Sequence, residues 1–422
     1  MRFIGLDVHR DFCEVAIAEG GALRSAGRIE TTPAALRLFA ESLGSEDSVA
    51  LEATTQAAQV ARLIEPHVAR VVIANTRKLA AITQAKAKTD RLDARTLARL
   101  LASGYLEQVW APDEETRSLR RLVARRSRLV RARTRAKNEV HGVLARNLCP
   151  RPPVTDAFGK AGRRWLSTLV LPDDEQLTLE GCLRQIDFLD EEVGAIERKI
   201  AERALQSVDI RRLMTVPGVN VQTAAAFVAS VGDIGRFSSP RKLVSYLGLD
   251  PRVRQSGSEV ARHGHISKAG SAEARHMLGE VAWKVMMTPG PLRAFFERVR
   301  SRRGPQVAAT ATARKLVVLF WHLLTREEDY AFARPAMTRK KIRQLELLAG
   351  APPRKGKAGV AGNFANRHVR EAERELSGQA EAAYRRLVSD WRASGPKKKG
   401  AGATPGRASS RPSKRQAARQ AQ

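Results

Sequence analysis

Four acidic residues of this chain have positions and spacing that could bind a metal ion. Asp7 lies inside the apolar run FIGLDV and Glu52 inside VALEA, where an unpaired carboxylate in a buried strand is costly. Asp90 and Asp93 are three residues apart in KTDRLDARTLARLL, so both lie on one side of a helix. Acids from two neighbouring strands and one helix can converge on hard divalent cations, which prefer carboxylate oxygen and leave positions for phosphate. The pattern predicts a Mg²⁺ or Mn²⁺ site.

The two pairs of acids differ in how well an ordinary structural role explains them. Asp90 could cap a helix with Asp93 in its first turn, where the helix dipole favours acids, and for that pair alone this explanation is equally good. Asp7 and Glu52 have no such alternative, and two charges in buried-type strands favour a functional role.

Three polar residues near Asp7 fit the site less well. Asp11 and Glu14 follow the first strand into its turn, where we expect side chains to be exposed. His9 is a tempting further ligand, but a single histidine at a strand end is more often a bystander, and we leave it out of the predicted site.

The elements that must position these acids follow from the spacing of apolar residues. Three apolar runs predict an antiparallel meander, and helices then alternate with strands to about residue 104. This order describes an α/β ribonuclease-H-like, RuvC-like fold in which VALEA lies beside the first strand. The expected strands are 3–8, 13–19, a third through Ile29, 49–53 and 70–75; the expected helices follow Pro33, run from Gln56 to Ile64 and end at Leu101.

The middle of the chain is predicted to be helical and elongated. Apolar residues recur at alternating intervals of three and four, which is the heptad seam of a coiled coil. The alternative, equally weighted, is that the seam packs only on the preceding basic helix of the same chain. The seam residues are Leu179, Cys182, Ile186, Leu189, Val193, Ile196 and Ile200.

That preceding helix is strongly basic. From Arg117 to Lys137 there are ten Lys or Arg residues and no acid. A solvated helix face normally mixes charges of both signs, so an unmixed arginine face favours binding to phosphate. The candidate contacts are Arg120, Arg121, Arg125 and Arg128.

Two segments of the C-terminal half are typical of phosphate binding. MTVPGVNVQTAAAFVASVGD has the pattern of a helix-hairpin-helix, in which Gly218 would allow a phosphate to approach helix N–H groups, although an ordinary turn between helices is also compatible. LDPRVRQSGSEVARHGHISKAG is a small, polar and basic loop in which Arg252 and Lys268 could stabilise phosphate charge. Its composition does not distinguish Ser256, Ser258, Ser267 and Ser271 as nucleophiles, and loop serines commonly form turns.

The composition of the chain restricts its partners. With 422 residues, a net charge of +30 and a pI near 11.1, we expect several domains and a polyanionic partner. The N-terminus MRFIGLDVHRDF lacks the apolar stretch of a signal peptide, and Leu316–Leu324 is too short to span a bilayer, so we expect a cytoplasmic, nucleoid-associated protein with a core helix there and no membrane. Three scattered cysteines predict no zinc site.

The end of the chain has a different composition. Residues 394–422 carry eight Lys or Arg residues, no acid and no aromatic residue, which predicts a disordered basic tail. A linker precedes it, with one possible helix from Arg367 to Arg392.

Together these motifs resemble the transposases of the bacterial insertion sequence 110 family. GLDVHRDF, ALEATT and KTDRLDARTLARLL resemble the family's DEDD domain; VPGVNVQTAAAFVASVGD, FSSPRKLVSYLGLDPRVRQSGS, GHISKAGSAEARHML and RRGPQVAATATARKLVVLFWHLL resemble its C-terminal half. The resemblance covers about Met1 to Tyr330. We expect a DEDD metal-binding domain over 1–110, the basic helix and coiled coil over 111–207, a mainly helical transposase domain over 208–335, and the linker and tail over 336–422.

The resemblance implies a reaction and its partners. It identifies Ser256 of QSGS as the nucleophile that attacks a DNA phosphodiester and forms a covalent phosphoserine link, while the metal-bound acids polarise the phosphate. It implies a homo-oligomer, dimer or tetramer, that assembles the acids and the serine. It also implies a structured noncoding RNA that pairs with donor and target DNA.

Two other functions remain compatible with the residues. A RuvC-like junction nuclease would need only the four acids and a water nucleophile. A non-catalytic basic protein that binds DNA or RNA would need only the charge.

Overall fold

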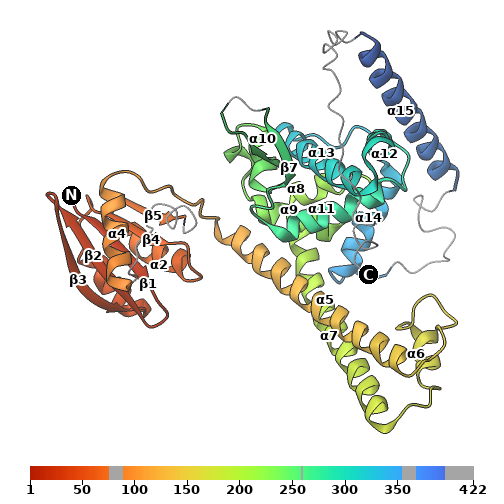
Figure 1. The fold of residues 1–422 in the computed structure, drawn as a ribbon, viewed down its shortest axis with the longest axis horizontal. Coiled ribbons are helices and arrows are strands. Elements are labelled where there is room, and N and C mark those ends of the chain that lie inside the picture. The colour runs from red at the N-terminus through yellow and green to blue at the C-terminus, as the bar shows by residue number, and fades with distance from the viewer. Residues whose placement is uncertain (76–88, 258–259, 354–366, 395–422) are drawn as a thin grey trace, which may run out of the picture. The chain divides into compact units, whose positions relative to one another are not determined.

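The computed structural model describes residues 1–75, 89–257, 260–353 and 367–394 (Figure 1). These residues form two compact units, Met1–Arg117 and Ser118–Gln422. The predicted tail beyond residue 394 and the candidate Ser258 lie outside the described residues.

The first unit contains one five-stranded mixed sheet with the order β3-β2-β1-β4-β5. The meander of the first three strands is antiparallel, and β1, β4 and β5 run parallel to one another. The predicted strands are confirmed, including the pairing of β4 beside β1. The strands are β1 Phe3–Val8, β2 Phe12–Glu19, β3 Ala22–Glu30, β4 Ser48–Glu52 and β5 Arg70–Ala74.

Helices cover both faces of this sheet. α1 (Pro33–Glu41) and α2 (Ala57–Ile64) bury the face of Ile4, Leu6 and Val8, and a short helix η1 (Glu65–His67) follows α2. α4 (Asp90–Ala102) covers the other face and packs on Ala50, Val72 and Ala74. The sheet and α4 are visible together in Figure 1.

Gly5 lets α4 lie directly on the sheet. A Cβ atom at this position would lie 2.1 Å from the carbonyl oxygen of Ala94 and 2.6 Å from the amide nitrogen of Ala98. A glycine here therefore sets how closely α4 approaches β1, and with it the position of any side chain that starts from the first turn of α4.

The middle of the chain contains a long antiparallel helix pair. α5 (Glu114–Arg146) and α7 (Asp173–Gln206) are joined through the short helix α6 (Lys160–Leu166). The predicted seam of α7 packs on α5 of the same chain, with Leu179, Cys182 and Ile186 on Ala136, Val140 and Leu144, and Leu189 and Val193 on Leu129. Of the two alternatives, packing on the basic helix is the one observed within the chain (Figure 1).

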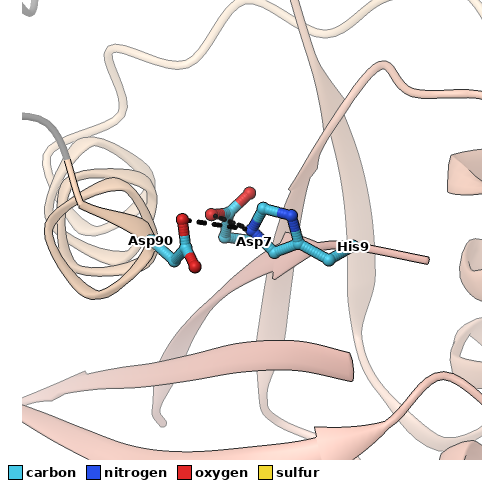
Figure 2. A group of neighbouring side chains, drawn as sticks. All are labelled: Asp7, His9 and Asp90. Carbon is cyan, nitrogen blue, oxygen red and sulfur yellow. Dashed lines mark hydrogen bonds and ion pairs between the residues drawn. The ribbon is translucent and has the colours of Figure 1, made fainter. Parts of the chain in front are cut away.

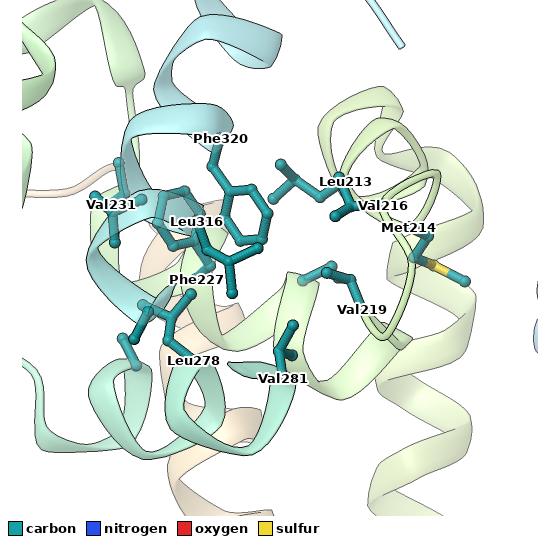
Figure 3. Close-up of a cluster of buried hydrophobic side chains, with 14 of the residues drawn as sticks. Leu213, Met214, Val216, Val219, Phe227, Val231, Leu278, Val281, Leu316 and Phe320 are labelled. Atoms are coloured by element: carbon teal, nitrogen blue, oxygen red, sulfur yellow. The ribbon is translucent and has the colours of Figure 1, made fainter. Parts of the chain in front are cut away.

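The rest of the second unit is mainly helical around one core. Phe227 of α9 and Phe320 of α13 meet at its centre with ring centroids 4.9 Å apart, and Leu213 and Leu278 lie beside them (Figure 3). A two-stranded hairpin projects from these helices. The elements are α8 Val208–Leu213, α9 Val221–Val231, η2 Ile234–Arg236, α10 Pro240–Tyr246, β6 Pro251–Arg254, β7 Arg262–Ile266, α11 Ala272–Val285, α12 Pro291–Arg303, α13 Pro305–Arg326, α14 Pro335–Leu348 and α15 Arg367–Ser394.

The apolar run that ends near Leu324 belongs to α13. By length and composition alone α13 is the one helix of the described residues that could cross a membrane, and half of its most apolar stretch is buried in the protein. Leu316, Val317 and Phe320 are fully buried in the core, which is the place expected for this run.

Two helices follow α13, in the part of the sequence expected to be a linker. α14 was not expected; Lys341 donates hydrogen bonds from Nζ to the carbonyl oxygens of Met214 (2.6 Å) and Val216 (3.0 Å) and joins α14 to the turn after α8. α15 matches the helix expected near residues 367–392. Its buried Glu381 accepts hydrogen bonds from Gly290 N (3.0 Å) and Arg293 Nε (2.8 Å), which fix α15 against α12.

Candidate active site

Asp7 lies on the face of the sheet that α4 covers. It is 9% exposed and is the fifth residue of β1, two positions after Gly5 and therefore on the same face. Glu14 of β2 is its cross-strand partner. Glu52 of β4 follows the aligned pair Leu6 and Leu51, so it continues the same row on the other side of Asp7. Three neighbouring strands thus present acids at the same level of one face.

The start of α4 brings two further acids to this face. Thr89 caps the helix, because its hydroxyl oxygen accepts a hydrogen bond from the amide nitrogen of Leu92 (3.3 Å). Asp90 is the first residue of the helix and Asp93 lies in its first turn. The cap that Asp90 could have provided is therefore made by Thr89, which leaves the Asp90 carboxylate for another role.

His9 lies between the strand and the helix. Its Nε2 atom is 3.0 Å from Oδ2 of Asp7 and 3.3 Å from Oδ1 of Asp90 (Figure 2). The potential ligand atoms of Asp7, His9 and Asp90 all lie within 4.8 Å of one another. The interpretation of His9 as a bystander therefore did not predict that its ring lies beside both acids. Alternate residues of an extended chain lie on the same face, so residues 5, 7 and 9 share one face. This alternation could have predicted that His9 lies near Asp7.

The charges around Asp7 favour a bound cation. Burial raises the pKa of Asp7, hydrogen bonding and attraction from His9 oppose this, and the nearby Asp93 and Asp90 raise it further. Ionised carboxylates in such proximity repel one another unless a positive charge lies among them. Carboxylate oxygens with one imidazole nitrogen form a donor set that fits a divalent ion such as Mg²⁺ or Mn²⁺.

Glu52 and Glu14, the other two acids on this face of the sheet, differ in their burial and contacts. Glu52 is partly buried at the end of β4 and lies outside the group of three whose ligand atoms are within 4.8 Å. Glu14, expected to be exposed near a turn, is instead 6% exposed in β2, where its Oε2 accepts a hydrogen bond from Arg28 Nε (2.7 Å). That expectation was wrong because Glu14 pairs with Asp7 and lies on the face of the sheet that α4 covers.

The second unit presents Ser256 at the tip of the β6–β7 hairpin. Ser256 is exposed, and its hydroxyl has no hydrogen-bond partner among the residues that the structure describes. Two of the alternative serines have structural bonds instead. Ser267 donates from Oγ to Oδ1 of Asp250 (2.7 Å), and Ser271 caps α11 by accepting from the amide nitrogen of Ala274 (3.2 Å).

The base of this hairpin is tightly packed. Gly248 and Gly270 both have positive φ, and a Cβ atom on Gly270 would lie 2.0 Å from the carbonyl oxygen of Tyr246. Arg275 donates from one nitrogen to the carbonyl oxygens of Leu247 (3.0 Å), Ala269 (2.8 Å) and Gly270 (3.2 Å). A fixed base thus carries an exposed tip. Arg252 is exposed on β6, and Lys268 is exposed at the base, where its amide nitrogen donates to the carbonyl oxygen of Gly248 (3.1 Å).

The predicted phosphate-binding residues outside the hairpin fall into two groups. Arg120 donates to the carbonyl oxygens of Ala229 (2.5 Å) and Ser230 (3.0 Å), and Arg125 pairs with Glu192 (3.1 Å), so both hold elements together. Arg121 and Arg128 are exposed on α5, and no partner of Arg128 lies among the described residues.

Gly218, the expected phosphate contact of a helix-hairpin-helix, has a role in packing. Its φ is +83°, and a Cβ atom there would lie 3.4 Å from the Cβ atom of Lys284 and 3.6 Å from Val281 of α11. The positive φ and the contact with α11 account for this glycine without a ligand.

Models of known protein families match both the N-terminal and the C-terminal part of the chain. A transposase model for DEDD proteins of the IS110 type matches residues 4–148, and a model described as the transposase IS116/IS110/IS902 family matches residues 210–297. The transposase for insertion sequence element IS1111A of Coxiella burnetii is 31% identical over 259 residues, which cover 58% of this chain and 68% of that protein. The chain belongs to the IS110 family of transposases.

Other relatives of this transposase agree with that assignment. The y4qE protein of Sinorhizobium fredii, also named as a transposase, is 30% identical over 293 residues, covering 68% of this chain and 72% of its own length. The pilin gene-inverting protein of Moraxella bovis is 36% identical over 66 residues, which are 16% of this chain and 20% of that protein.

Membership in the IS110 family relates the observed site to a reaction on DNA. An IS110-family transposase acts on DNA by cleaving and rejoining it, and its DEDD domain indicates a divalent metal. All four predicted acids lie within the matched residues 4–148, and Ser256 lies within 210–297.

Proposed function

We propose that this transposase moves an insertion sequence by a metal-dependent reaction in which Ser256 is the nucleophile and Asp7, Glu52, Asp90 and Asp93 bind the metal. The observation that carries the proposal is the convergence of Asp7, His9 and Asp90 under α4, with ligand atoms within 4.8 Å, inside the region that matches DEDD transposases. The sheet order β3-β2-β1-β4-β5 with α4 on one face supports a ribonuclease-H-like, RuvC-like domain as the frame of this site.

The acids have separate tasks in this proposal. Asp7 provides a carboxylate in a fixed position, because β1 is central in the sheet and Gly5 seats α4 beside it. Asp90 and Asp93 supply oxygens from the helix, and Glu52 supplies one from the neighbouring strand. A bound Mg²⁺ or Mn²⁺ would polarise a phosphate oxygen and reduce the repulsion that an anionic phosphate meets among carboxylates.

Ser256 is proposed to form the covalent intermediate. Its Oγ attacks the phosphorus of a DNA phosphodiester, the bond from phosphorus to the leaving deoxyribose oxygen breaks, and the serine proton passes to that oxygen through solvent. The phosphoserine ester keeps the bond energy, so a hydroxyl of another DNA end can reverse the step without ATP. Ser256 suits this role because it is exposed and unbonded among the described residues, whereas Ser267 and Ser271 are committed to structural bonds.

The charge of the hairpin supports a role of Ser256 in binding phosphate. Arg252 on β6 and Lys268 at the base of the hairpin are exposed, and their positive charge would attract a phosphodiester to this element. A relative named for inverting a pilin gene must rejoin the strands that it cleaves, and this favours a recombinase over a nuclease that only cuts.

We also propose two kinds of partner. A structured noncoding RNA would select donor and target DNA by base pairing while exposed arginines such as Arg121 and Arg128 follow its backbone without reading bases. A homo-oligomer, dimer or tetramer, would supply the several active groups that exchange of two DNA strands requires.

The proposal is tested by excision and insertion of the native element from a plasmid that carries the gene with its natural flanking DNA. We expect Asp7→Asn, Glu52→Gln and Ser256→Ala each to lower the recovered junctions by at least about a hundredfold. Ser245→Ala is the matched control, because Ser245 is also an exposed serine near the hairpin.

The alternatives give different results in the same assay. Cleavage that persists in Ser256→Ala would identify a nuclease with a water nucleophile. Normal junction formation by Asp7→Asn would remove the acids from the reaction.

A further inference from the structure

His9 is held in place by its backbone and its ring. Its amide nitrogen donates to the carbonyl oxygen of Phe12 (2.9 Å), and its carbonyl oxygen accepts from Oγ1 of Thr31 (3.0 Å). The imidazole ring lies 4.9 Å from the ring of Phe12, centroid to centroid. The placement of Nε2 beside Asp7 and Asp90 is therefore set by the fold of the turn between β1 and β2.

A bare nitrogen lone pair would not be stable in this place. Nε2 faces one carboxylate oxygen at 3.0 Å and another at 3.3 Å, so a positive centre, either a proton or a cation, must lie among the three atoms. Neighbouring ligands of an octahedral ion with bonds of about 2.1 Å lie about 3.0 Å apart. The two separations from Nε2, 3.0 and 3.3 Å, match this spacing, and the Asp7 and Asp90 ligand atoms lie within 4.8 Å of each other.

From this we infer that Nε2 of His9 is a ligand of the divalent ion held by Asp7 and Asp90, and that this nitrogen biases the site toward Mn²⁺ over Mg²⁺. The inference rests on the proposed metal site and adds a ligand that the four acids do not include. Mg²⁺ takes oxygen ligands and gives up its water reluctantly, whereas imidazole is a ligand of transition metals. One nitrogen in a set of carboxylates therefore favours the transition ion without excluding Mg²⁺.

The first experiment detects the bond between the nitrogen and the metal. The full-length protein is prepared with histidine carrying the heavy nitrogen isotope, loaded with less than one equivalent of Mn²⁺, and examined by electron spin echo envelope modulation. We expect the nitrogen modulation to change with the isotope in the wild-type protein and to be lost in His9→Gln. His265→Gln is the matched control and should keep the modulation, because His265 is exposed on β7.

The second experiment measures the Kd of each ion by calorimetry. Loss of a group that merely supports a ligand costs about 10- to 100-fold in metal affinity, so we expect His9→Gln to raise the Kd for Mn²⁺ at least tenfold. The Kd for Mg²⁺ should change less than about threefold.

The possible results separate this inference from the proposed function. Mn²⁺ binding that depends on Asp7 but shows no histidine modulation would overturn the role of His9 and leave the acids as ligands. A protein that binds no Mn²⁺ at all would overturn both. The isotope comparison uses wild-type protein, so it shows whether a histidine binds the ion even if His9→Gln does not fold, and the one group of possible ligands found among the described residues contains no other histidine.

Discussion

Asp7 lies in a position that lowers the stability of the metal-free fold. Burial of its carboxylate in β1 raises its pKa, and the nearby Asp93 and Asp90 raise the pKa further. An acid whose pKa is higher in the folded protein than in the unfolded chain binds more protons when folded, so raising the pH through this window lowers the stability. The destabilisation is complete above the raised pKa and absent below the ordinary value of about 3.9.

Asp7→Asn should therefore raise the melting temperature of the metal-free protein at neutral pH. The gain should shrink as the pH falls toward about 4, because wild-type Asp7 is then protonated. The measurement is thermal unfolding in chelator across this pH range. A change of about 1 kcal/mol moves the melting temperature of a domain of about 100 residues by about 4–8 °C, so the direction is measurable.

Asp47→Asn is the control with the opposite sign. Burial alone would raise the pKa of Asp47, but hydrogen bonds from Arg2 and the amide of Gly44 outweigh it and lower the pKa. This acid therefore stabilises the fold at neutral pH, and the contribution is lost as the pH falls. If Asp7→Asn and Asp47→Asn changed the melting temperature equally, the burial of the Asp7 carboxylate would not be what destabilises the fold.

The sequence predicted which acids are buried in strands better than it predicted the side chains around them. Asp7 and Glu52 were recognisable because a charge interrupts an apolar strand. The burial of Glu14 and its pairing with Arg28 depend on where β2 begins and how it aligns with β3. The closeness of His9 to Asp90 depends on how α4 lies over the sheet, a contact between residues more than eighty positions apart that no short window of sequence contains.

Among the elements, α4 is the one that completes the acidic site, and Gly5 determines its distance from β1. Gly5→Ala would bring a Cβ atom 2.1 Å from the carbonyl oxygen of Ala94, so α4 must move away from the sheet. We expect a loss of about 1–3 kcal/mol in the free energy of unfolding and weaker Mn²⁺ binding. Chemical denaturation and calorimetry measure the two effects.

Gly44→Ala tests whether the effect belongs to the contact with α4. A Cβ atom at Gly44 would have its nearest neighbour, Asp47, at an ordinary 3.5 Å. This variant should keep both stability and metal binding. If Gly5→Ala bound Mn²⁺ as tightly as the wild type, α4 would not be what positions the acids.

The arginines of α5 divide between structural and exposed positions. Arg120→Ala should cost about 1–3 kcal/mol of stability, because it removes the side-chain donor of the Ala229 carbonyl oxygen and leaves that of Ser230 with only the longer bond from Tyr246 (3.3 Å). Arg128→Ala should change stability by less than about 0.5 kcal/mol but reduce the salt dependence of RNA binding by about one phosphate contact.

Denaturation curves and binding measured over a range of salt concentrations distinguish these roles. If Arg128→Ala left RNA binding unchanged at every salt concentration, its side of α5 would not be the RNA surface. If Arg120→Ala were as stable as the wild type, its two hydrogen bonds would be of no consequence to the fold.

Helices and strands were predicted more completely than the contacts between them. Alternating and heptad patterns are local, and they located the sheet and the seam of α7. The acids that neutralise α5 come from α7, with Arg125 and Glu192 separated by 67 residues and Arg126 and Glu197 by 71. The basic face of α5 was therefore interpreted as carrying charges of one sign only, although the neighbouring helix α7 supplies acids that pair with it.

For the whole molecule, the net charge of +30 predicts binding to nucleic acid but does not locate it. Several arginines of α5 are paired with acids of α7, so part of the charge is neutralised within the protein. The eight Lys or Arg residues of 394–422 lie in the sequence beyond the residues matched by the transposase models. General affinity and catalysis should therefore be separable.

Removal of residues 395–422 should weaken general binding to nucleic acid and flatten its dependence on salt, by up to about 0.9 in slope for each lost contact with phosphate. Recombination of the native element should be retained. Binding and junction formation are measured on the same preparation. An unchanged salt dependence would show that the tail takes no part in binding.

In the proposed reaction Ser256 becomes covalently linked to DNA with the help of the acids. The most direct measurement traps the protein on a DNA substrate from the native element, digests the adduct and maps the modified peptide by mass spectrometry. We predict a phosphodeoxynucleoside on Ser256, absent from Ser256→Ala and strongly reduced in Asp7→Asn. Cleaved DNA with no adduct, or an adduct on another residue, would contradict the account.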